Sequence, residues 1–116
     1  MRTAQIITAV VPALVFVPLG VAKIAAVPVM RRTAAHLGMS PGLYRVVGTL
    51  EVVGAAGLLA GLAWLPLGAA AAAGLTVLMA AAAVVHLRHG DPPARAVPAA
   101  VLALVAVAYI GLSIAA

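Results

Sequence analysis

The hydrophobic positions of this chain gather into four long stretches, which are separated by more polar connections: a long basic loop at 23–43, a tight turn at 64–66 and a polar segment at 88–95. Each stretch approaches the length of about 20 residues that a helix needs to cross the hydrocarbon core of a bilayer. The four stretches cover residues 4–22, 44–63, 67–87 and 96–114. This pattern predicts an all-α integral membrane protein, folded as a four-helix transmembrane bundle in a single domain over residues 1–116.

The composition supports a lipid environment and excludes several classes of function. The chain is 66% hydrophobic and only 8% charged, whereas soluble domains are about 25% charged. Cysteine is absent, which excludes disulfides, thiolate metal sites and cysteine nucleophiles within the chain. The net charge of +5 comes with only 3% aromatic residues, so the basic, aromatic-lined groove of a nucleic-acid binder is not expected.

The basic residues predict an orientation in the membrane. Five lysine and arginine residues lie in the segments 23–43 and 88–95, whereas the opposite end has only Arg2. The positive-inside rule then places both segments in the cytoplasm and both termini outside. Two alternatives remain: Arg2 by itself favours the reverse orientation, and the first stretch resembles a signal peptide with small residues near its end.

The most informative polar residue is Glu51, one of only two acidic side chains, within the stretch 44–63. Inserting such a carboxylate costs about 2.5 kcal/mol or more, and these residues usually face a bundle interior or a cavity. Glu51 lies roughly 10 Å from the start of its stretch, at the same expected depth as Lys23 and His86. We therefore predict a polar site at Glu51, Lys23 and His86, with Arg45 long enough to reach Glu51 or the interface.

Three interpretations of Glu51 remain open at this point. Glu51 fixes the helix register through Lys23 or a hydroxyl group, or it anchors a small ligand or lipid, or it exchanges protons. The hydroxyl candidates are Tyr44, Thr49, Thr76 and Tyr109. His86 likewise either contacts headgroups at a helix C-terminus or faces Glu51 as its proton partner.

Motifs for soluble-enzyme chemistry are missing from the sequence. There is no glycine-rich phosphate loop, dinucleotide fingerprint or Ser-His-Asp arrangement, so no catalytic residue is assigned and enzymatic activity stays undecided. His86 and His89 have no clear third ligand, and no metal site is predicted. Gly57 and Gly61 form a GxxxG motif, which favours packing within the bundle over a dimer interface.

Several segments taken together resemble the DoxX-like family of small bacterial membrane proteins, which share a four-helix transmembrane bundle. The similar segments are GVAKIAAVP (20–28), HLGMSP (36–41), VGTLEVVGAAGLL (47–59), LPLGAAAAAGL (65–75) and AVVHLRHGDP (83–92). The resemblance carries over Lys23, Gly38, Gly48, Glu51 and His86 as members of the family's polar and glycine pattern. Ile24 is a mild departure, because a leucine commonly follows the lysine.

The resemblance also implies a setting for the protein, the bacterial plasma (inner) membrane. The family name derives from a subunit of a thiosulfate:quinone oxidoreductase, and relatives are linked with membrane redox complexes. Without cysteine, a redox role here depends on a bound quinone or a protein partner. The leading hypothesis is an accessory or small-hydrophobic-ligand-binding component of a membrane complex. The alternatives are a quinone-linked oxidoreductase subunit and a small proton-coupled transporter.

Overall fold

The computed structural model describes residues 2–115 and places them in five helices. These are α1 (Arg2–Ile24), α2 (Pro28–His36), α3 (Pro41–Ala60), α4 (Leu65–Arg88) and α5 (Pro93–Ala115). The helices α1, α3, α4 and α5 are long and apolar enough to cross a membrane, and no strand occurs within residues 2–115. The prediction of an all-α, four-helix membrane bundle is confirmed.

Helix α2 is a correction to the sequence analysis, which expected a loop between the first two spans. Pro28 occupies the first turn of α2, where the missing N–H of proline is harmless and its fixed φ favours a helix. The chain reaches this point through Ala26, which adopts a positive φ of 52°. With nine residues, α2 is too short and too polar to be found from apolar spans alone.

The ends of the long helices also shift by a few residues from the predicted spans. Helix α3 begins at Pro41, because the hydroxyl of Ser40 accepts a hydrogen bond of 3.0 Å from the Leu43 N–H and caps the helix. It ends at Ala60 instead of residue 63. Helix α5 begins at Pro93 instead of residue 96, which places Arg95 inside the helix.

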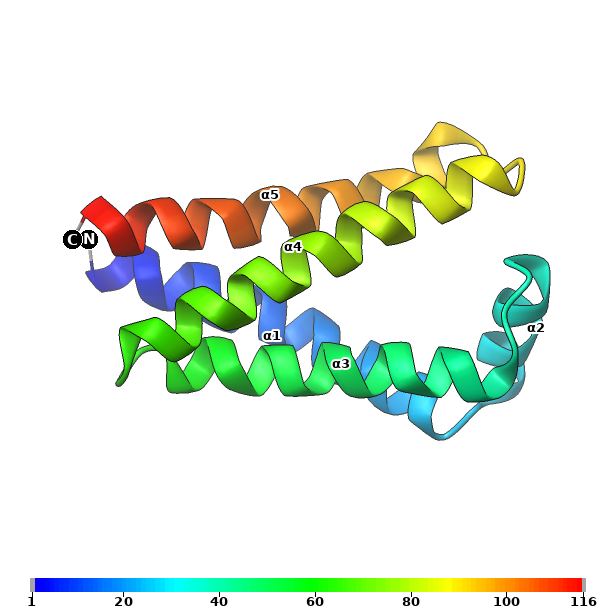
Figure 1. Ribbon diagram of the computed structural model, residues 1–116, viewed down its shortest axis with the longest axis horizontal. Helices are drawn as coiled ribbons and strands as arrows, with labels where there is room; N and C mark the ends of the chain where they lie inside the picture. Colours follow the sequence, from blue (N-terminus) through cyan, green and yellow to red (C-terminus); the bar gives the residue numbers. More distant parts are fainter. Residues whose placement is uncertain (1, 116) are drawn as a thin grey trace.

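The bundle consists of two helix pairs. Helix α1 packs mainly along α3, and α4 packs mainly along α5. Figure 1 shows the pairs close together at the end where α1 begins and α5 ends, and divergent toward α2. The buried core between them includes Phe16, Leu58, Leu75 and Tyr109.

Glycines set the close approach of α3 to α4. A Cβ on Gly57 would lie 2.6 Å from the Cβ of Ala71, and Gly61 meets Gly68 across the turn between the helices. The hydroxyl of Tyr109 from α5 occupies the space beside Gly68. The GxxxG motif therefore serves packing within the bundle, as the sequence analysis favoured.

A second glycine contact joins α1 to α3. A Cβ on Gly48 would lie 2.6 Å from the Gly20 carbonyl oxygen, and a Cβ on Gly20 would lie 2.7 Å from the Gly48 carbonyl oxygen. The two backbones are therefore in direct contact. The same crossing sets Lys23 beside Gly48 and Glu51 beside Gly20, so the close approach brings these two charged residues together.

Replacing Gly48 with alanine is expected to lower the free energy of unfolding by about 1–3 kcal/mol, the usual cost of overpacking a tight contact. The matched control is Gly74→Ala in α4, because a Cβ there meets no atom within 4 Å. Thermal unfolding of both variants in detergent micelles measures the difference. Equal melting temperatures would contradict the backbone contact between α1 and α3.

Candidate functional site

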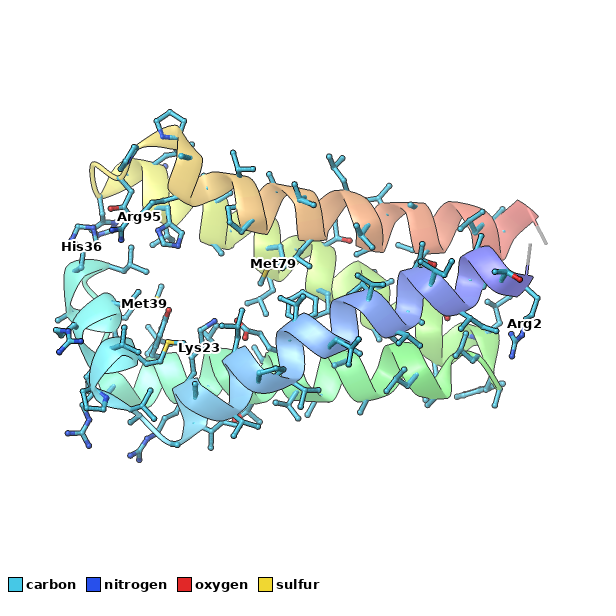
Figure 2. All side chains as sticks on the ribbon, turned by 180° about the vertical axis from the view of Figure 1, so that it is seen from behind. Arg2, Lys23, His36, Met39, Met79 and Arg95 are labelled. Atoms are coloured by element: carbon cyan, nitrogen blue, oxygen red, sulfur yellow. The ribbon has the colours of Figure 1, made fainter. Side chains whose placement is uncertain are left out.

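A cavity of about 250 Å³ lies between the two helix pairs, toward the α2 end of the bundle. Side chains from α1, α3, α4 and α5 line it, together with residues of the segment between α2 and α3. Most of the lining is apolar, and the polar exceptions are Lys23, Tyr44, Glu51, His86 and Arg95. Figure 2 shows Lys23 and Met39 on one side of this region and Met79 and Arg95 on the other.

Lys23 and Glu51 form an ion pair at the wall of this cavity, in which the Lys23 Nζ donates a hydrogen bond to the Glu51 Oε1. Glu51 is only 1% exposed. Pairing offsets the high cost of burying each charge. The Lys23 Nζ also lies 5.2 Å from the centroid of the Tyr44 ring, within the range of a cation–π interaction.

The second carboxylate oxygen of Glu51, Oε2, is buried and has no hydrogen-bond partner among the described residues. Two of the hydroxyl candidates are engaged elsewhere, because Thr49 donates to the Arg45 carbonyl and Thr76 donates to the Ala72 carbonyl. Of the partners that the sequence left open for Glu51, Lys23 is the one in hydrogen-bond contact with it, and it uses one of the two carboxylate oxygens.

His86 lines the same cavity, but its hydrogen bond is made with a different carboxylate. Its Nδ1 lies 2.6 Å from the Asp91 Oδ2, and the Asp91 Oδ1 lies 2.6 Å from the Nε2 of His36. Of the two roles that the sequence left open for His86, a direct hydrogen bond to Glu51 is not the one seen, because the imidazole contacts Asp91. Gly90, with a φ of 78°, turns the chain so that Asp91 folds back against the end of α4.

Asp91 links α2 to the α4–α5 connection across the cavity end of the bundle. Hydrogen bonding to His86 is the main cause that holds the pKa of the Asp91 carboxyl below its ordinary value, and His36 adds to the effect. Asp91 therefore stays ionised over the physiological pH range. Within residues 2–115, no group of three or more histidine, aspartate and glutamate side chains is arranged to hold a metal ion.

Two arginines differ from the sequence-based prediction in whether they line the cavity. Arg45 is exposed on α3 and does not line the cavity, so the structure does not bring it to Glu51. Arg95 does line the cavity, although the sequence analysis treated it only as a topology signal. The reason is that α5 begins at Pro93, which puts Arg95 in the first turn of the helix.

The fold defines a small helical membrane protein with a largely apolar cavity between its two helix pairs. Comparison with protein families places it further, because the chain matches the DoxX-like family over residues 7–108. The chain therefore belongs to the DoxX-like family. No match was found among curated proteins or among solved structures.

Replacing Lys23 with methionine is expected to destabilise the protein by about 3–5 kcal/mol, because it leaves the Glu51 carboxylate buried without its cation. Arg45→Met is the matched control and should change stability by only about 0.5 kcal/mol or less, as exposed positions usually do. The free energy of unfolding in mixed detergent micelles measures both effects.

The single variant Glu51→Met and the double variant Lys23→Met/Glu51→Met complete a double-mutant cycle. The comparison that matters is between the double variant and the single ones. The double variant should be more stable than Lys23→Met alone, since removing both charges also removes the unpaired carboxylate. A double variant whose destabilisation equals the sum of the two single effects would contradict the ion pair as a coupled unit.

Proposed function

We propose that this DoxX-like protein binds a small hydrophobic ligand between its two helix pairs, with Glu51 as the polar anchor. The observation that carries the proposal is that Glu51 lines a largely apolar cavity and has one buried carboxylate oxygen without a partner among the described residues. Binding sites for small molecules combine a largely apolar lining with a few polar groups that fix orientation. The five polar residues among the apolar lining, Lys23, Tyr44, Glu51, His86 and Arg95, are groups of this kind.

An accessory role within a membrane complex is the second part of the proposal. Several hydroxyl groups already have structural roles, since Ser40 caps α3 and Thr49 and Thr76 donate to carbonyls of their own helices. None of these three hydroxyls is hydrogen-bonded to a histidine or carboxylate that could activate it. Holding or presenting a ligand therefore fits these groups better than hydrolytic chemistry.

The test is mass spectrometry of organic extracts from protein purified in mild detergent. A defined lipophilic compound should be enriched in the wild type and lost in Glu51→Gln, which removes the ionised anchor. It should also be lost in Ala82→Phe, which fills the cavity from α4. Thr49→Val is the matched control, because Thr49 is exposed on α3 outside the cavity.

Ordinary phospholipid in equal amounts from all four proteins would contradict ligand binding. The Lys23–Glu51 pair would then serve to fix the register between α1 and α3. Because the chain crosses a membrane, the extract must be compared with the bulk lipid of the same preparation, and enrichment over that lipid is the quantity that counts.

A quinone-linked oxidoreductase subunit is the second candidate function. The observation that favours it is the presence of Glu51, Tyr44 and His86 around one apolar cavity. These side-chain types can donate and accept the protons that accompany quinone reduction. A quinone or its reduced quinol in the wild-type extract, lost with Glu51→Gln, would favour this function. A different compound in the same extract would count against it.

We further propose that the protein lies in the bacterial inner membrane with the α2 end facing the cytoplasm. Six basic residues belong to the α2 end, from Lys23 to Arg45 and from Arg88 to Arg95. At the other end, Arg2 donates a hydrogen bond of 2.7 Å to the Leu62 carbonyl oxygen. The charge asymmetry supports this orientation through the positive-inside rule.

Single cysteines test the orientation cleanly, because the natural chain has none. Ala35→Cys places a thiol on the exposed face of α2, and Ala63→Cys places one at the exposed turn between α3 and α4. A membrane-impermeant maleimide added to intact cells should label Ala63→Cys and leave Ala35→Cys unlabelled until the cells are permeabilised. The opposite labelling pattern would reverse the orientation.

A further inference from the structure

We infer that the ligand of this cavity is an uncharged amphiphile with a hydroxyl group, an alcohol or a phenol, whose O–H donates a hydrogen bond to the Glu51 Oε2. The inference rests on the proposed function and adds the chemical class of the ligand. It stands on the hydrogen bonds of Glu51, the charge balance beside Glu51, and the cavity size.

The hydrogen bonds of Glu51 indicate that the ligand must donate a hydrogen bond to its Oε2 atom. An ionised carboxylate only accepts hydrogen bonds. Its Oε1 receives the Lys23 ammonium, whereas its Oε2 is buried without a donor among the described residues. Buried polar atoms in folded proteins nearly always have a partner. A ketone, ether or ester offers acceptors alone and leaves Oε2 unsatisfied, whereas a hydroxyl group supplies the missing donor.

The charge balance decides that the ligand head is neutral. Lys23 and Glu51 compensate each other at the cavity wall, and most of the surrounding lining is apolar. A charged head beside this pair would bring a third, uncompensated charge out of water, which is costly. An ammonium group is therefore disfavoured, although it also donates. An anion is attracted instead to Arg95, which is exposed at the cavity.

The cavity size sets the scale of the ligand. An apolar cavity of about 150 Å³ in a protein core accommodates benzene. The cavity beside Glu51 has a volume of about 250 Å³, which corresponds to a body of about two fused aromatic rings on that scale. 2-Naphthol is therefore a suitable probe, and 2-methoxynaphthalene is its matched analogue, with the same ring system and no O–H donor.

The sequence offers a direct spectroscopic readout on the wild-type protein. Glu51 is the only glutamate in the chain, so protein labelled with ¹³C at the glutamate side-chain carboxyl gives one carboxylate signal from that residue type. Saturating 2-naphthol should shift the Glu51 signal in the full chain in detergent micelles, because its O–H bonds to the carboxylate. 2-Methoxynaphthalene should occupy the cavity and leave the signal close to its starting position.

Affinity measurements give the second readout. A hydrogen bond to a charged acceptor should make 2-naphthol bind about 10-fold to 100-fold more tightly than 2-methoxynaphthalene. The ratio of the two affinities should fall several-fold in Glu51→Gln, whose amide is a weaker acceptor. Ala82→Phe should weaken both probes. Comparing the ratio between proteins in one detergent cancels the partitioning of each probe into the micelle.

The outcomes separate this inference from the proposed function. Equal affinity for the two probes, with the Glu51 signal unmoved by 2-naphthol, overturns the hydroxyl ligand and leaves the cavity as a hydrophobic binding site. Tighter binding of 2-naphthoate than of 2-naphthol also overturns it, in favour of an anionic ligand at Arg95. No binding of any of the three probes overturns both the inference and the proposed function. The NMR readout needs no variant, so a poorly folding Glu51→Gln does not prevent the test.

Discussion

The contact between α1 and α3 is the constraint on which the candidate site depends. Gly20 and Gly48 let the two helix backbones come into contact. This close approach allows the Lys23 ammonium to reach the Glu51 carboxylate inside the bundle. Neither charge would be tolerated there alone, since an uncompensated ion in an apolar environment is very costly. The glycine contact and the ion pair therefore support each other: the first gives proximity and the second makes the buried carboxylate stable.

The cavity follows from an uneven distribution of small residues along the bundle. At the end where α1 begins, Gly61 and Gly68 bring α3 and α4 together and the Tyr109 hydroxyl lies against them. Toward α2 the two helix pairs diverge (Figure 1), and the longer side chains of that region line a cavity. The polar groups of the site collect at this divergent end, and the opposite half of the bundle is packed with apolar side chains.

Asp91 connects the polar segments at the α2 end of the bundle through hydrogen bonds. Its two carboxylate oxygens bind His36 and His86, so one side chain connects α2 with the end of α4. The two acidic residues of the chain thus have separate tasks: Glu51 lies with Lys23 at the cavity wall, and Asp91 holds together the polar segments outside the spans. This division could not be read from the sequence, because the contacts of Asp91 with His36 and His86 depend on how α2 and the α4–α5 connection fold together.

The amino-acid sequence by itself determined the class of the protein, because four apolar stretches with 8% charged residues leave few stable solutions other than a membrane bundle. It also placed Lys23 and Glu51 at the same depth, which left Lys23 as one of several candidate partners for the carboxylate. Tertiary structure decided the partner of His86, the presence of Arg95 at the cavity and the exposure of Arg45. Those outcomes depend on helix rotation and on a turn at Gly90, and both are set by packing between distant segments, which hydrophobic spacing along the chain does not encode.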